Sequence, residues 1–102
     1  MSDSIIQSER ACYATGATQN LHRHHCFKAS RRNLSEKYGL WVWLRADVHQ
    51  LMHDHNPPYE KLEEALKIAA QRAFEDNGGT REEFMAIFGA NYIYNQHEIE
   101  QR

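Results

Sequence analysis

Histidines are the residues of this sequence with the greatest capacity for chemistry. The chain has seven, and six of them fall between positions 22 and 55. They include an adjacent pair, His24 and His25, and a pair four positions apart, His49 and His53. Imidazole is a common ligand of divalent transition metals and titrates close to neutral pH, so it also serves as a proton acceptor. The clustering therefore indicates a metal site or a catalytic centre.

Two predicted elements would position these pairs. Residues 20–27 (NLHRHHCF) fit a strand, in which neighbouring side chains point to opposite faces. Residues 46–53 (ADVHQLMH) fit a helix, because their apolar residues recur at helical spacing. Such a helix places His49 and His53 on one face. If it packs across the strands, one strand histidine and both helix histidines can converge on one cation, and the other strand histidine is left as a general base.

The remaining histidines have less definite roles. His22 shares a strand face with His24, so it is an accessory ligand, a phosphate contact or a surface residue. His55 lies six positions after His49 and falls off its helix face, but it competes with His53 as a ligand if the helix ends early. We expect His97 on the surface. A purely structural role for all of these histidines is the alternative to a site.

The rest of the chain predicts a small α+β protein. Residues 1–11 are expected to form an irregular or short helical arm, and residues 12–19 a turn around Gly16. The other expected elements are a polar, basic loop (28–36), a strand rich in aromatic residues (38–44), an amphipathic helix (59–76), a helix that begins with a capping box at Thr80 and ends at Gly89 (80–88), and a tail at residues 92–94 that packs back. The apolar stripe expected on the long helix is Leu62, Ala65, Leu66, Ala69, Ala73 and Phe74.

Length and composition narrow the class of protein. The chain has 102 residues, the length of one domain. Charged residues make up 25% and hydrophobic residues 41%, the usual mixture for a globular domain in water. No apolar run approaches the roughly 18 residues of a membrane span, the first ten residues lack the regions of a signal peptide, and two cysteines do not make a disulfide framework. We therefore expect a cytoplasmic protein with no membrane partner.

Basic residues gather in the same part of the chain as the histidines. Between His22 and Arg45 lie six lysines and arginines and one acidic residue, Glu36, although the whole chain has a net charge of −2. A basic stretch on a mildly acidic protein indicates a local anionic partner. A solvated basic face with no partner would give the same pattern.

The order of these features resembles the ββα-metal finger of HNH endonucleases. Residues 24–44 (HHCFKASRRNLSEKYGLWVWL) are similar to small phage and prophage HNH proteins, which typically read HHIFGG, then an Arg/Lys pair, then a Ser-x-KYGL strand. Residues 70–93 (AQRAFEDNGGTREEFMAIFGANYI) are similar to the helical extension of that group. The resemblance covers roughly residues 12–93. It implies a single domain over 1–102, with a ββα-metal finger at 12–55 and a helical extension at 56–94.

The resemblance also implies a metal-dependent endonuclease that hydrolyses DNA phosphodiester bonds in a bacterial host cell and leaves a 5′-phosphate and a 3′-hydroxyl. In that family pattern His24, His49 and His53 resemble the ligands of a divalent ion (Mg²⁺, Mn²⁺, Ni²⁺ or Zn²⁺), and His25 resembles the general base. A homodimer is compatible with the resemblance. The residues expected to contact the DNA backbone are Arg23, Lys28, Arg31, Arg32 and Lys37.

Three features depart from the family pattern. Many HNH fingers bind a structural zinc through two Cys-x2-Cys pairs, and only Cys12 remains here, so no four-cysteine zinc site is expected. The asparagine that gives the motif its middle letter is absent near Gly39, and Asn33 lies too far upstream to replace it. The paired glycines of HHIFGG are Lys28 and Ala29.

These departures keep a second function open, a catalytically degenerate module that binds DNA or a protein partner. The four retained histidines favour the enzyme, because a module without catalysis does not need metal-ligand geometry. A purely structural metal-binding domain would leave the basic stretch unexplained. Trp41 and Trp43 are expected to pack in the core instead of stacking on bases. Cys26 is expected to be a small core residue, because no group that would activate its thiol is evident.

Overall fold

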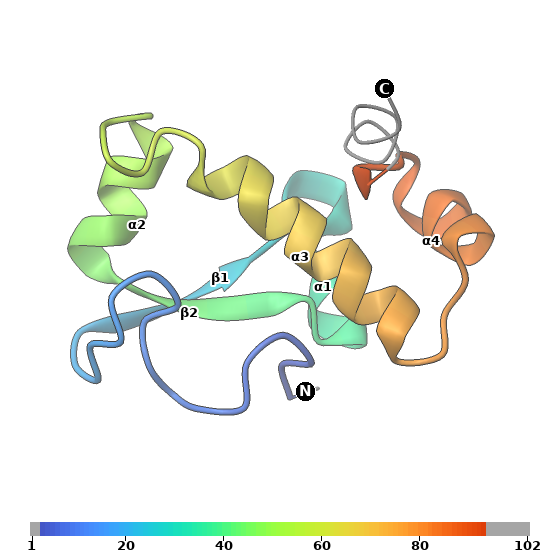
Figure 1. The fold of residues 1–102 in the computed structure, drawn as a ribbon, viewed down its shortest axis with the longest axis horizontal. Helices are drawn as coiled ribbons and strands as arrows, with labels where there is room; N and C mark the ends of the chain where they lie inside the picture. The colour runs from blue at the N-terminus through green and yellow to red at the C-terminus, as the bar shows by residue number, and fades with distance from the viewer. Residues whose placement is uncertain (1–2, 94–102) are drawn as a thin grey trace, which may run out of the picture.

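The computed structural model describes residues 3–93 and has an α+β fold with two antiparallel strands and four α-helices (Figure 1). This confirms the predicted α+β class. In chain order the elements are β1 (Leu21–His25), the 3-10 helix η1 (Ala29–Arg31), α1 (Arg32–Tyr38), β2 (Trp41–Arg45), α2 (Ala46–His53), α3 (Leu62–Asp76) and α4 (Arg81–Phe88).

The two strands form the platform on which the histidines are arranged. They pair antiparallel, with Leu21 opposite Arg45 and His25 opposite Trp41. Both strands were predicted, but each is shorter or shifted. The second begins at Trp41, because Tyr38 still belongs to a helix and Gly39 ends that helix in the left-handed conformation, with φ of 71°.

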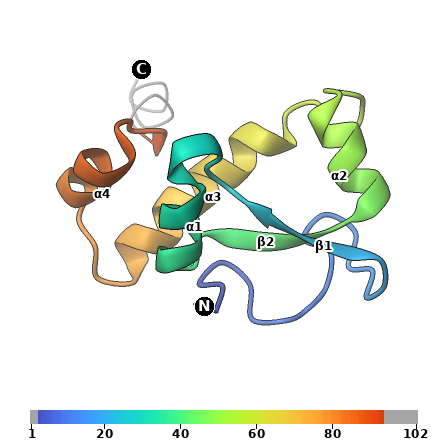
Figure 2. The ribbon, with the colours of Figure 1, turned by 180° about the vertical axis from the view of Figure 1, so that it is seen from behind.

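The predicted loop over residues 28–36 is wrong, because this segment forms η1 and the first part of α1. Its exposed side chains are basic or polar, so the sequence carries little helical apolar pattern. The helix is fixed by one buried polar residue, Ser35, together with Leu34 and Tyr38, which pack half-buried against the core. The Ser35 hydroxyl donates to the Phe27 carbonyl at 3.0 Å and accepts from the Phe27 N–H at 3.1 Å. Figure 2 shows α1 at the far end of the strand pair from α2.

The N-terminal arm is irregular and lies along the outer edge of β2 (Figures 1 and 2). The Ser4 hydroxyl donates to the Trp41 carbonyl at 2.6 Å, and the Trp43 N–H donates to the Gln7 side-chain oxygen at 2.7 Å. Trp41 is buried, as predicted, and Arg23 lies over its ring at 3.9 Å. The prediction is wrong for Trp43, which is only half-buried and is covered by Arg10 of the arm. The arm therefore satisfies an edge that would otherwise be open to another strand.

Helix α3 runs across the strand pair from the α2 end to the α4 end (Figure 1). Its predicted apolar stripe is partly wrong, because Ala65 is exposed and the buried residues are Leu66, Ala70, Gln71 and Phe74. The helix is rotated toward Gln71 because this amide anchors the tail after α4. It donates to the Asn91 side chain at 2.8 Å and accepts from the Tyr92 N–H at 2.7 Å.

Helix α4 begins as predicted. Thr80 and Glu83 form a reciprocal capping box, with hydrogen bonds of 3.0 and 2.9 Å, and Gly89 ends the helix with φ of 77°. Buried residues of β2, α2, α3 and α4 belong to one hydrophobic core. Within residues 3–93, each helix is too short or too polar to cross a bilayer.

Candidate active site at the histidine cluster

Strand β1 sends His24 and His25 to opposite faces, as the strand period requires. His24 is 2% exposed, and its ring centroid lies 5.2 Å from that of His49 and 6.4 Å from that of His53. The His25 ring contacts Glu36 of α1 instead. The predicted separation of the adjacent pair onto two faces is therefore confirmed.

Helix α2 holds the other two histidines against His24. The helix begins at Ala46, directly after β2 ends at Arg45, so its register relative to the sheet is fixed without an intervening loop. Buried Val48 and Met52 anchor one face of α2 in the core. His49 and His53 share a neighbouring face, with ring centroids 4.6 Å apart and Nε2 atoms 3.1 Å apart.

The ring of His24 is buried and neutral. Burial, followed by the charges of His49 and Lys28, lowers the pKa of His24 to about 3. Its Nε2 atom is buried and makes no hydrogen bond within the described residues. An unpaired buried polar atom costs free energy unless something binds it. Burial also lowers the pKa of His49, with His53 and His22 adding to the effect.

The chemistry of this donor set fits a divalent transition metal, because neutral imidazoles are suitable ligands and one of them has an orphaned nitrogen. The residues that would hold the ion are His24, His49 and His53. Among residues 3–93, however, no group of three or more His, Cys, Asp or Glu side chains is placed so that it could hold a metal ion as it stands. Two nitrogens bound to one ion at about 2.0–2.1 Å lie about 3.0–3.4 Å apart, so the 3.1 Å between the Nε2 atoms of His49 and His53 fits shared ligation once both lone pairs face the ion.

On the other face of β1, His25 is held by a carboxylate. Its Nε2 lies 2.8 Å from Glu36 Oε1, and Arg23 Nη1 lies 3.0 and 3.1 Å from the two carboxylate oxygens. The hydrogen bond from His25 is the main cause that lowers the pKa of Glu36, so the carboxylate is ionised near neutral pH. Because an ionised carboxylate only accepts, the His25 proton lies on Nε2 and the lone pair on Nδ1.

Glu36 was not assigned a role from the sequence. The available signal was its position as the one acidic residue in the basic stretch. Arg32 Nε donates a long hydrogen bond of 3.5 Å to His25 Nδ1, so a cationic side chain occupies the basic nitrogen.

One open hollow of about 230 Å³ joins the two histidine groups. Its basic residues include three of the five predicted DNA contacts. Lys28 also donates to Glu63 of α3 at 3.0 Å, which ties the hollow to the helical extension. The residues that line the hollow are Arg23, His24, His25, Lys28, Arg32, His49 and His53.

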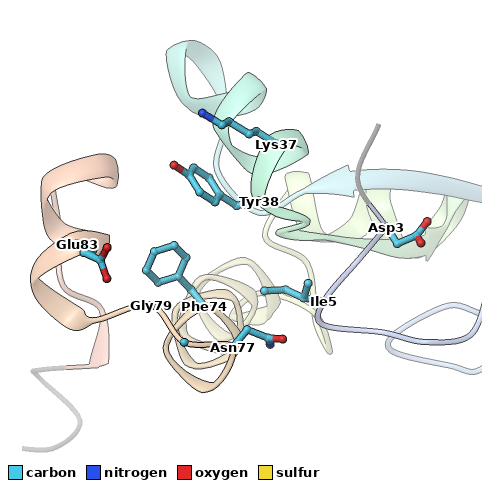
Figure 3. Close-up of a pocket in the computed structure, with 9 residues that line it drawn as sticks. Asp3, Ile5, Lys37, Tyr38, Phe74, Asn77, Gly79 and Glu83 are labelled. Atoms are coloured by element: carbon cyan, nitrogen blue, oxygen red, sulfur yellow. The ribbon is translucent and has the colours of Figure 1, made fainter.

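The other two predicted DNA contacts lie elsewhere. Arg31 packs over the end of α4, where its Nη2 would stand 2.9 Å from a Cβ added at Gly89. Lys37 lies at the edge of a separate hollow of about 450 Å³, whose apolar residues include Ile5, Tyr38 and Phe74 (Figure 3). The structure therefore does not bring Arg31 or Lys37 to the histidines.

The two histidines considered as accessory ligands, His22 and His55, do not line this hollow. His22 Nδ1 lies 3.4 Å from His49 Nδ1, but His22 lines a different hollow from the other histidines. His55 follows the end of α2 in a left-handed conformation, with φ of 54°, and His53 is the one that contacts His49. His97 lies outside the described residues.

Cys26 has no nucleophilic role in this arrangement. It is completely buried, and burial raises the pKa of its thiol to about 12. Cys26 is thus the small core residue that was predicted. Cys12 is also buried, and both cysteines are free thiols.

Comparisons with protein-family models, with curated proteins and with solved structures found no match. The side chains around the hollow are therefore what indicates a function for this chain.

Proposed function

We propose that this chain is a metal-dependent endonuclease of the HNH type that hydrolyses DNA phosphodiester bonds. The observation that carries the proposal is the single hollow that contains both a base held by a carboxylate and an orphaned buried imidazole beside two others. A structural cluster of histidines does not need a base held by a carboxylate. A simple phosphate-binding patch does not need an orphaned buried imidazole.

His25 would act as the general base. Once Arg32 turns from His25 Nδ1 to a phosphate oxygen, the Nδ1 lone pair takes a proton from a water molecule, and the ring becomes an imidazolium whose Nε2–H remains bonded to Glu36. The carboxylate charge stabilises this imidazolium and fixes the orientation of the ring. The arrangement follows the general logic of a base oriented by an acid behind it.

His24, His49 and His53 would hold the divalent cation. When bound, the ion supplies Lewis-acid stabilisation of the negative charge that develops on the phosphate and on the departing 3′ oxygen. Arg32 and Lys28 line the same hollow and would bind the phosphate by charge. Arg23 is already engaged by Glu36, so we propose that it supports the base instead of contacting DNA.

The test is cleavage of supercoiled plasmid with Mg²⁺, Mn²⁺, Ni²⁺ or Zn²⁺, with metal binding measured by calorimetry on the same samples. We expect His25→Ala to bind metal normally and to lose about 10²–10⁴-fold in rate. His49→Ala should lose metal affinity and recover part of its activity at high metal concentration. Gln50→Ala, on the solvent face of α2, is the matched control.

A DNA- or protein-binding module without catalysis is the second candidate. It is favoured by the arrangement of the ligand set, because no three His, Cys, Asp or Glu side chains among residues 3–93 are placed to hold a metal ion. It requires that DNA binding persist with no cleavage under any metal. That result, with His25→Ala identical to the unmodified chain in every assay, would replace the nuclease proposal.

A further inference from the structure

Four side chains form a continuous line of contacts across the candidate metal site. Lys28 Nζ lies 3.3 Å from His53 Nδ1, His53 Nε2 lies 3.1 Å from His49 Nε2, and His49 Nδ1 lies 3.4 Å from His22 Nδ1. Each of the two central rings uses both of its nitrogens. His22 and His53 therefore contact opposite edges of the His49 ring.

Lys28 sets the donor-to-acceptor direction of the hydrogen bonds along this line. An ammonium group can only donate, so His53 Nδ1 must accept. A neutral imidazole has one N–H and one lone pair, so the His53 proton lies on Nε2 and is donated to His49 Nε2. The His49 proton must then lie on Nδ1, from which it is donated to His22 Nδ1. One donor at one end thus determines the tautomers of both α2 histidines.

We propose that Lys28 and His22 are positioning residues that fix the ring tautomers of His53 and His49. The consequence for metal binding rests on the proposed function, whereas the tautomers follow from the contacts alone. His49 presents its Nε2 lone pair on the side of His53, and His22 holds the opposite nitrogen. Metal-binding histidines commonly donate their second ring N–H to an acceptor that fixes the ring. His22 is therefore an orienting acceptor and not a ligand.

Lys28 has the opposite effect on His53. While Lys28 donates to Nδ1, that nitrogen has no free lone pair, and the other nitrogen carries the proton. Neither nitrogen of His53 can then bind a cation, so metal binding requires Lys28 to leave. Lys28 already donates to Glu63 Oε2 at 3.0 Å, so it can leave His53 and keep that bond, and a substrate phosphate oxygen would be a further acceptor.

The first test measures tautomers in the full chain without metal. Long-range ¹⁵N–¹H correlation of the imidazole nitrogens should show opposite tautomers, with the proton on Nδ1 of His49 and on Nε2 of His53. Lys28→Met should mix the tautomers of both rings, because the line then has no fixed donor. A proton on Nε2 of His49 in the unmodified chain would overturn the proposal.

The second test measures Co²⁺ binding by calorimetry and visible absorption. His22→Ala should lower the affinity about 10- to 100-fold with an unchanged Co²⁺ spectrum, and His22→Asn should restore most of it, because the amide oxygen can accept from His49 Nδ1. Gln50→Ala should bind as the unmodified chain does. A changed spectrum in His22→Ala, with no rescue by Asn, would show that His22 is a ligand and overturn its assignment.

Lys28 is tested against a second lysine that removes the same charge. Lys28→Met should bind Co²⁺ more tightly than the unmodified chain, and more tightly than Lys67→Met, since Lys67 has no contact with His53 among the interactions of the described residues. Equal affinities of the two variants would overturn the role of Lys28. If the unmodified chain binds no Co²⁺, the proposed metal site fails, while the tautomer measurement still decides the positioning proposal.

Discussion

Replacing Glu36 by Gln tests whether the carboxylate behind His25 contributes to proton transfer. The amide keeps an oxygen that can accept the His25 Nε2–H, so the orientation of the ring is preserved. What is lost is the negative charge. His25 becomes a cation when it takes the proton from water, so the substitution destabilises that state and leaves the resting state almost unchanged.

The size of the effect follows from the geometry of the contact. The Nε2 to Oε1 distance is 2.8 Å, and the side chains of His25 and Glu36 are 10% and 26% exposed, so solvent screens the pair only in part. A hydrogen bond to a charged group contributes about 1.5–3 kcal/mol. That corresponds to a decrease of about 10- to 100-fold in cleavage rate, smaller than the decrease expected for His25→Ala.

The assay combines cleavage at saturating metal with calorimetric metal binding and thermal unfolding. Metal affinity should be unchanged, because Glu36 lies on the opposite face of β1 from His24. The melting temperature should change by no more than several degrees, because a partly exposed ion pair such as Arg23–Glu36 contributes at most about 1 kcal/mol. A folded Glu36→Gln protein that cleaves at the rate of the unmodified chain would refute the role of the carboxylate.

Three further predictions concern DNA binding, the thiols and acid stability. Arg32→Ala should make DNA affinity less dependent on salt, by about 0.9 in the log–log slope for each phosphate that is no longer neutralised. Arg31→Ala should leave the slope as it is in the Arg72→Ala control, and an equal loss of slope in Arg31→Ala and Arg32→Ala would place both arginines on the DNA. Cys26 should react with a thiol reagent at pH 8 only as fast as the chain unfolds, since burial raises the pKa of its thiol to about 12, and rapid labelling of the folded protein would contradict this. The Arg45 guanidinium lowers the pKa of Asp47 from 3.8 to about 2, so its stabilising effect is present above about pH 4 and disappears as the pH falls toward 2; Asp47→Asn should be less stable than the unmodified chain near neutral pH, and this difference should shrink as the acid limit is approached.

The strands and α2 could be predicted because their signals are local. Aromatic and β-branched residues mark β2, and the i, i+4 pair in α2 fixes which histidines share a face. The alternation of His24 and His25 is likewise a property of any strand. These three local rules account for the histidine side of the site.

What the sequence did not predict depends on contacts between distant residues. Helix α1 has a mostly polar surface and is held by Ser35 beside only two apolar residues, Leu34 and Tyr38, so its apolar pattern is weak. Glu36 reaches His25 only because α1 folds back on β1. Arg31 and Arg32 are adjacent in sequence, yet Arg31 packs against α4 while Arg32 faces the hollow. A count of basic residues in the sequence cannot tell which of these two arginines faces the hollow.

The two halves of the site differ in how completely their partners are arranged. On one face of β1, the base has a short hydrogen bond to a carboxylate that is itself held by Arg23. On the other, His24 Nε2 has no partner among the described residues, and the α2 rings contact each other. The carboxylate side of the base is preorganised and the ligand set is not assembled, so metal binding must reorganise more side chains than proton transfer, for which only Arg32 has to leave His25 Nδ1. Substitutions along the line from Lys28 to His22 should therefore alter metal affinity, whereas substitutions around Glu36 should alter the rate at saturating metal.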